Sequence, residues 1–114
     1  MAALKLRIDL EPDARIGPGK IALLEQIAAT SSISAACRTM GMSYKRAWDL
    51  VDEMNRMFKE DVVARQIGGR NGGGATLTPF GADLVWRFRF IERAAQGAVA
   101  SQLAALQAAI APSA

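Results

Sequence analysis

Histidine is absent from this chain of 114 residues, and cysteine occurs only once, as Cys37. Without histidine, the chain lacks the usual general base of enzymes and the commonest metal ligand. A single cysteine excludes an intramolecular disulfide and every cysteine-rich zinc site, and one unpaired thiol fits a reducing cytoplasm. We therefore expect a protein that is not an enzyme, holds no metal and needs no cofactor.

Long apolar runs are also missing. The richest apolar stretch lies near the C-terminus and is interrupted by the charged residues Arg87, Arg89, Glu92 and Arg93. These charges exclude a membrane span. Residues 1–10 alternate charged with aliphatic side chains and lack the apolar core of a signal peptide. The composition, 51% hydrophobic and 22% charged, is that of a globular protein, and the length predicts one domain. We expect a cytoplasmic protein without a membrane partner.

Acidic residues are missing from two stretches of the chain, although its formal net charge is only +3. Residues 30–48 contain Arg38, Lys45 and Arg46 but no acid. Residues 62–82 contain Arg65 and Arg70 and again no acid. Two basic windows in a chain of mixed charge favour a surface that faces a polyanion. Ordinary scatter of surface charge is the alternative.

The N-terminal part begins with a strict alternation of apolar and polar residues over residues 4–10, typical of a half-buried strand. Its inward face is expected to hold Leu4, Leu6, Ile8 and Leu10. Residues 11–19 contain two prolines and two glycines and are predicted to form a connection. A helix is then expected from Pro18 or Lys20 to about Thr30. Its apolar stripe consists of Ile21, Leu24, Ile27 and Ala28.

The next two apolar patterns are those of short helices joined by a tight turn. The apolar set of the first helix consists of Ile33, Ala36, Cys37 and Met40. We expect Ser34 to cap its N-terminus, Ile33 to precede it as a hydrophobic staple, and Gly41 to end it in a left-handed conformation. Ser43 is the predicted N-cap of the second helix, over residues 44–58. This arrangement is a helix-turn-helix pattern, in which Cys37 is a small buried residue.

In a helix-turn-helix, the first residues of the second helix reach base edges in the major groove of DNA. The candidate contacts here are Ser34, Ser43, Tyr44, Lys45 and Arg46. Lysine and arginine donate to guanine acceptors, and serine and tyrosine bond to phosphates or bases. Asp49 either accepts from a cytosine or pairs with Lys45 or Arg46, and we favour the ion pair. Trp48 adjoins the apolar face and is predicted to belong to the core.

After residue 58 the pattern becomes that of strands. Residues 62–67 and 75–78 favour strands, and five of the chain's ten glycines lie between them. This pattern predicts a hairpin, or wing, whose tip carries Arg70 and Asn71 toward a phosphate or the minor groove. Glycine lets a backbone approach another molecule closely, and the glycines concerned are Gly68, Gly69, Gly72, Gly73 and Gly74. No Gly-Lys-Ser/Thr follows, so the loop is not a P-loop, and a hairpin without a ligand is the alternative.

A last helix is predicted from Pro79 to about Ile110, with Thr78 as its N-cap. Its aromatic residues, among them Trp86 and Phe90, fall on several faces. A long helix with more apolar surface than one neighbour covers favours a homodimer. The expected dimer interface consists of Phe80, Leu84, Phe88, Ile91 and Ala95. The alternative is an amphipathic helix that caps the core and frays at its alanine-rich end.

The expected fold is mainly α with a small antiparallel sheet. Residues 1–78 are predicted to form a winged helix-turn-helix domain that binds DNA, and residues 79–114 a C-terminal dimerisation helix in the same compact unit. Motifs over residues 4–110 also carry a family resemblance. They are Gly-Pro-Gly-Lys at 17–20, Ser-Ile-Ser-Ala-Ala at 32–36, Gly-Met-Ser-Tyr-Lys-Arg-Ala-Trp at 41–48, Asp-Glu-Met-Asn at 52–55, the loop at 68–74 and Leu-Thr-Pro-Phe-Gly at 77–81.

This combination resembles the N-terminal DNA-binding half of the ModE-type molybdate-responsive transcriptional regulators, a winged helix-turn-helix akin to the LysR type. The resemblance implies a cytoplasmic homodimer, joined through its terminal helices, that binds a palindromic operator in double-stranded DNA and serves molybdenum homeostasis. It places residues 43–46 in the recognition helix and Arg70 in the wing. Full-length relatives continue into an oxyanion-binding molybdate domain, which nothing in these residues resembles, so a full-length relative is a further candidate partner.

A second class of function stays open. The chain could be a dimerising interaction module, or co-regulator, that pairs with another regulator without binding DNA itself. A third reading is a glycine loop that binds an oxyanion. Lys45, Arg46 and Arg70 favour DNA, because a pure interaction module needs no acid-free basic windows. The salt dependence of binding to duplex DNA discriminates between these classes.

Overall fold

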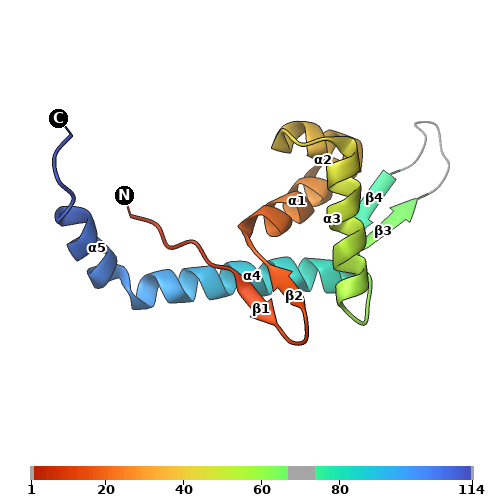
Figure 1. The fold of residues 1–114 in the computed structure, drawn as a ribbon. Helices are drawn as coiled ribbons and strands as arrows, with labels where there is room; N and C mark the ends of the chain where they lie inside the picture. The colour runs from red at the N-terminus through yellow and green to blue at the C-terminus, as the bar shows by residue number, and fades with distance from the viewer. Residues whose placement is uncertain (1, 67–73, 114) are drawn as a thin grey trace.

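The computed structural model describes residues 2–66 and 74–113, which form five helices and two small antiparallel sheets (Figure 1). The mainly α fold expected from the sequence is confirmed, with two two-stranded sheets in place of one. In chain order, the elements are β1 (Ile8–Leu10), β2 (Ala14–Ile16), α1 (Pro18–Thr30), α2 (Ile33–Met40), α3 (Tyr44–Met57), β3 (Val63–Gln66), β4 (Gly74–Leu77), α4 (Pro79–Ala98) and α5 (Ala100–Ala108).

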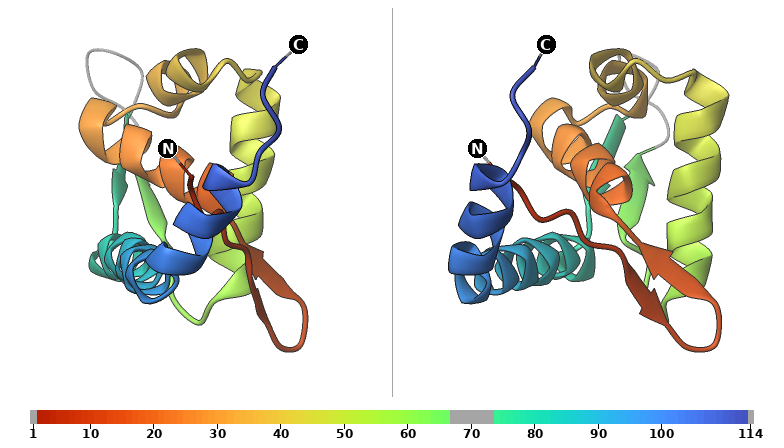
Figure 2. Two further views of the ribbon diagram at one scale, coloured as in Figure 1. Left: turned by 90° about the vertical axis from the view of Figure 1, so that its left-hand side faces the viewer. Right: turned by 60° about the vertical axis from the view of Figure 1, so that its left-hand side comes forward.

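Helices α1, α2 and α3 form a head, and α4 passes beneath the head and extends beyond it as an arm that ends in α5 (Figures 1 and 2). The β3–β4 hairpin lies beside α3. The end of the hairpin at which Gln66 pairs with Gly74 lies at the same end of the molecule as the N-terminus of α3 (Figures 1 and 2). The arm makes the molecule elongated, with extents of 55 × 35 × 21 Å.

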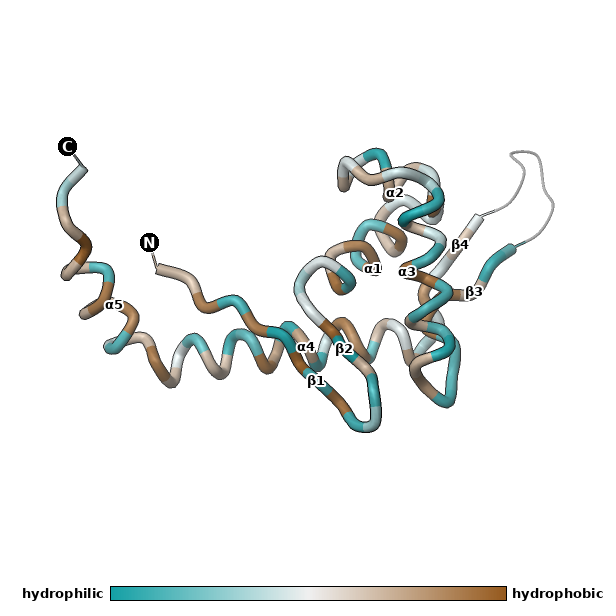
Figure 3. Tube along the Cα trace, viewed as in Figure 1, coloured by the Kyte–Doolittle hydropathy of each residue, from teal (hydrophilic) through white to brown (hydrophobic). Residues whose placement is uncertain are grey.

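The core lies between the head helices, the hairpins and the first half of α4. Its largest fully buried side chains are Ile16, Ile21, Leu23, Leu24, Ile27, Val51, Met54, Val62, Val63 and Phe88. Cys37 is buried with them, as expected. Hydrophobic residues also occur along α5, far from this core (Figure 3), and Leu106 there is 68% exposed. The core therefore buries the apolar side chains of the head, whereas apolar side chains of α5 stay exposed.

The N-terminal strand is shorter than predicted and belongs to a hairpin. β1 pairs with β2, so residues 11–19 contain a strand as well as a connection. The register places Ile8 opposite Ile16 and Asp9 opposite Arg15. The alternation of burial holds up to Ile8, but Leu10 is 43% exposed and does not share the inward face.

The prediction that Ser34 caps α2 is wrong, because the N-cap is Ser32. Ser31 ends α1 in a left-handed conformation, so Ser32 is the residue whose extended backbone (φ −152°, ψ 125°) suits an N-cap. Its Oγ accepts a hydrogen bond from the Ala35 amide at 3.0 Å. Ile33 is consequently the first residue of the helix, buried in the core, and not a staple that precedes the cap.

Two other expectations about helices are wrong. In α1, Ala28 is exposed and Leu23 is buried in its place, because α1 packs against α2 on one side and against β4 and α4 on another. The last helix is not continuous but breaks at Val99, whose backbone (φ −113°, ψ 13°) is not helical. Gly97 and the β-branched Val99 have poor helix propensity, which weakens the helix at this point.

Candidate nucleic-acid interface

The turn between α2 and α3 determines where α3 begins. Gly41 takes a left-handed conformation (φ 68°), and the Met42 amide donates to the Cys37 carbonyl at 3.0 Å, which closes α2. Ser43 Oγ then accepts a hydrogen bond from the Arg46 amide at 3.0 Å. Both caps predicted at this turn, Gly41 and Ser43, are confirmed. The first turn of α3 contains no acidic residue.

The side chains of Ser43, Tyr44, Lys45 and Arg46 are all exposed at this end of α3. The Lys45 ammonium pairs with Oδ2 of Asp49 at 2.9 Å, which confirms the ion pair favoured from the sequence. Exposed pairs of this kind contribute little to stability, so Lys45 can exchange Asp49 for a phosphate at small cost. Among the described residues, Arg46 has no carboxylate partner.

Trp48 connects α3 to the wing. It is half-buried and packs against the core, and Cζ of Arg65 in β3 lies 3.9 Å from the centroid of its ring. Tyr44 meets the same ring edge-on, with the centroids 6.3 Å apart. A cation–π contact at an exposed site contributes ~0.5–1 kcal/mol and holds the guanidinium of Arg65 beside α3. No pattern in the sequence indicates this contact, because it exists only once the hairpin has folded against the helix.

The base of the wing is fixed to the head by hydrogen bonds. Asn55 Oδ1 accepts from the amides of Val62 at 2.8 Å and Val63 at 3.1 Å, and Asn55 Nδ2 donates to the Val63 carbonyl at 3.2 Å. On the other strand, the Ala75 amide donates to the Ser31 carbonyl at 3.0 Å. One strand is thus tied to α3 and the other to the end of α1.

The two strands of the predicted wing are confirmed. β3 and β4 pair antiparallel, with Gln66 opposite Gly74. A Cβ atom at Gly74 would lie 3.0 Å from the Ser31 carbonyl oxygen, so this close approach favours glycine. The residues of the predicted tip lie outside the described part of the chain; they are Gly68, Gly69, Arg70, Asn71, Gly72 and Gly73. Ser34 lies in the first turn of α2, where its hydroxyl accepts a hydrogen bond from Nη1 of Arg38 at 3.0 Å.

The arm exposes large apolar side chains. Trp86, Phe90 and Ile91 are 58%, 50% and 42% exposed, and the rings of Trp86 and Phe90 stack with their centroids 5.4 Å apart. Of the residues expected at a dimer interface, Phe88 is buried in the core of its own chain, whereas Phe80, Leu84 and Ala95 are half-buried. A largely apolar groove of about 370 Å³ lies between the β1–β2 hairpin and α4, and it is lined by Ile8, Leu10, Ile16, Phe58, Phe80, Asp83, Leu84, Arg87, Phe88 and Ile91.

The arm is joined to the head by a charged contact. The Arg89 guanidinium binds Glu25 of α1 through two hydrogen bonds, of 2.6 and 3.2 Å, and Glu92 through a third, of 2.6 Å. These bonds to Glu25 and Glu92 raise the pKa of Arg89 above its ordinary value. The orientation of α4 is therefore coupled to that of α1.

Within residues 2–66 and 74–113, no helix combines the length and the apolar character needed to cross a bilayer.

Known proteins resemble this chain over most of its length. The chain is 49% identical over 79 residues to the molybdenum-pterin-binding protein MopB of Rhodobacter capsulatus, a match that covers 69% of this chain and 29% of MopB. It is 43% identical over 84 residues to the transcriptional regulator ModE of Yersinia pestis, which covers 74% and 32% of the two chains. It is 37% identical over 97 residues to the DNA-binding transcriptional dual regulator ModE of Escherichia coli, which covers 85% and 37%.

No family model matches the chain. The chain spans about a third of the length of these curated relatives. Identities of 35–49% over most of its residues, on a fold with a helix-turn-helix and a wing, show that the chain is homologous to the ModE and Mop proteins and corresponds to a ModE-type N-terminal domain.

Proposed function

We propose that this chain is a sequence-specific, DNA-binding transcriptional regulator. It binds a palindromic operator as a homodimer, through the recognition helix at residues 43–58 and the wing at residues 68–74. The observation that carries the proposal is the exposed, acid-free first turn of α3, where Arg46 has no carboxylate partner among the described residues. A guanidinium can donate to guanine, and the N-terminal end of a helix attracts phosphate.

The wing supports the same function. The contact between Arg65 and Trp48 places a second guanidinium beside α3, and Tyr44 extends this surface toward the first turn. Basic and aromatic groups therefore adjoin each other from the N-terminus of α3 to β3. Such a surface suits a duplex whose phosphates lie on both sides of an occupied groove.

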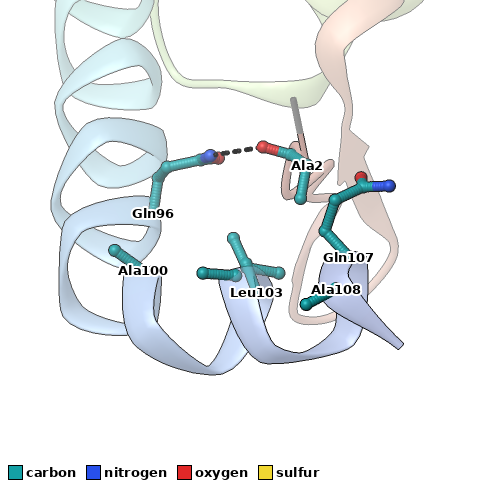
Figure 4. A pocket seen from close by; sticks show the side chains of 7 residues that line it. Ala2, Gln96, Ala100, Leu103, Gln107 and Ala108 are labelled. Carbon is teal, nitrogen blue, oxygen red and sulfur yellow. Dashed lines mark hydrogen bonds between the residues drawn. The ribbon is translucent and has the colours of Figure 1, made fainter. Parts of the chain in front are cut away.

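A homodimer explains the exposed arm. A helix that displays Trp86, Phe90 and Ile91 to water loses the stabilisation that burial would give, and a second copy of the arm can supply that burial. The break between α4 and α5 at Val99 offers further apolar surface (Figure 4). Gln96 holds the N-terminal segment there through the Leu4 amide at 2.9 Å and the Ala2 carbonyl at 3.2 Å, beside a pocket lined by Ala100 and Leu103.

Selection from a pool of random DNA duplexes tests this function. We expect enriched sequences to contain two inverted half-sites, because a two-fold dimer presents two recognition helices one helical turn, about 34–36 Å, or a multiple of it apart. Affinity for the enriched duplex should fall with salt, with a slope of roughly −0.9 per phosphate contact in a plot of log K against log salt. A pool without enrichment, together with no affinity for duplex at low salt, would contradict the proposal and leave a dimerising module.

A further inference from the structure

A basic groove lies beside the recognition helix, on the side away from the wing. Its volume is about 380 Å³, and it is lined by Arg7, Arg15, Gly17, Gly19, Lys20, Met42, Arg46 and Leu50. Arg46 and Trp48 are two residues apart, so they point to nearly opposite sides of α3. Since Trp48 faces β3, the groove and the wing flank α3 from its two sides.

Two of the four cations in this groove come from the β1–β2 hairpin and the residue before it: Arg15 lies in β2, and Arg7 directly precedes β1. Because Asp9 stands opposite Arg15, these side chains share one face of the hairpin, and Arg7 lies two residues before Asp9 on the same face. Ile8 and Ile16 occupy the other face. The register that turns Ile16 into the core thus turns the basic residues outward.

The carboxylates around the groove do not neutralise it. Asp9 binds Arg7, with N–O distances of 2.8 and 2.9 Å, and Glu53 binds the Lys20 ammonium at 3.0 Å. Lys20 also donates to the Arg15 carbonyl at 2.8 Å. Arg15 is exposed, and its guanidinium, like that of Arg46, has no carboxylate partner among the described residues. The groove therefore keeps an excess of positive charge.

The N-terminus of α1 opens into the same groove. Gly17 is its N-cap, without a side-chain hydrogen bond, and the first turn holds no acid. The first amides of a helix have no partner within the helix, and they attract anions. Nothing lies within 4 Å of the position that a Cβ atom of Gly19 would occupy, so the space beside these amides is open.

We infer that the basic groove binds a backbone phosphate of the DNA duplex that α3 reads, and that Arg15 is its principal ligand. The inference rests on the proposed function, since Arg46 borders both the groove and the tip of α3. A phosphate fits because guanidinium groups bind it bidentately and helix amides add further donors. With the wing on the other side, α3 would then be held by backbone contacts from both sides.

Replacement of Arg15 tests the inference. Arg15→Ala is expected to weaken binding to the selected duplex and to random duplex alike, by roughly tenfold for the dimer. It should also reduce the magnitude of the salt slope by about 0.9 for each protomer. Arg15→Lys keeps the charge but not the bidentate contact, so it should keep the salt slope of the parent with an affinity between those of the parent and Arg15→Ala. Lys59→Ala is the control, because Lys59 is exposed beyond the opposite end of α3 and its loss changes the net charge equally. Thermal unfolding of each variant verifies that it is folded.

The outcomes separate the groove from the function as a whole. If the parent binds DNA and Arg46→Ala weakens it, but Arg15→Ala behaves as Lys59→Ala does, the groove assignment is wrong and the function stands. If the parent binds no duplex, both proposals fail. If inorganic phosphate raises the melting temperature of the parent but not of Arg15→Ala, while their DNA affinities are equal, the groove is a site for small anions, and the inference is overturned.

Discussion

Arg46 and Lys45 are neighbours in α3, but they differ in whether a carboxylate holds the side chain. Lys45 is held by Asp49, whereas Arg46 has no carboxylate partner in the described part of the chain. A guanidinium can donate to both O6 and N7 of guanine, and an ammonium is a point charge. Arg46 is therefore the better candidate for reading a base, and Lys45 for binding a phosphate.

We expect Arg46→Ala to lower the ratio of affinities for the selected site and for random duplex by about tenfold or more, because a bidentate contact discriminates by roughly 1–3 kcal/mol. Arg70→Ala, in the wing, should weaken binding to all duplexes similarly. Fluorescence anisotropy with both duplexes measures the two effects. If both variants bind both duplexes as the parent does, the assignment of the DNA contacts is wrong.

Gly81 of α4 packs directly against the backbone of Val62, which precedes β3. A Cβ atom there would overlap the Val62 carbonyl oxygen, so we expect Gly81→Ala to lower the free energy of unfolding by about 2–3 kcal/mol. Gly97 is the matched control on the same helix, because nothing lies within 4 Å of its Cβ position. Gly97→Ala should raise stability by up to about 1 kcal/mol through helix propensity. Urea unfolding measures both, and equal effects would contradict this account.

At the scale of elements, the sequence predicts those whose signals lie within one segment. The helices α1, α2 and α3 each show an apolar period of their own, the caps Gly41 and Ser43 lie where the sequence predicts them, and α4 begins as predicted at Thr78 and Pro79. β2 has only three residues, and its pairing with β1 is what defines it. The basic groove and the Arg65–Trp48 contact join distant segments, and no local pattern encodes them.

The cap of α2 shows how a local signal can mislead. Two serines stand within three residues, and only the left-handed turn at Ser31 decides that Ser32 is the cap. We expect Ser32→Ala to destabilise the protein by about 1 kcal/mol, because the Ala35 amide loses its acceptor. Ser34→Ala removes only an exposed bond with Arg38 and should change stability by less than about 0.5 kcal/mol. Thermal or urea unfolding measures the stability of both variants. A larger loss of stability in Ser34→Ala than in Ser32→Ala would identify Ser34 as the cap.

At the scale of the whole molecule, the arm is joined to the head at more than one point. Arg89 joins α4 to α1 through Glu25, and Gln96 ties the N-terminal segment to α4. α1 in turn packs against α2, and α2 packs against α3. The position of the arm in a dimer would therefore fix the distance between two recognition helices, and with it the spacing of the half-sites.

Disruption of the arm should thus cost DNA affinity without changing any DNA contact. Phe90 is half exposed and stacks on Trp86, so Phe90→Glu places a carboxylate in the surface that we assign to the second copy, while Phe90→Leu keeps that surface apolar. We expect the glutamate variant to be monomeric by light scattering, to keep its helical circular dichroism, and to bind the palindromic site about tenfold or more weakly, because two linked half-sites no longer act together. The leucine variant should remain dimeric. A glutamate variant that stays dimeric with the parent's affinity would place the interface elsewhere, since a buried unpaired carboxylate is too costly for the proposed contact to survive.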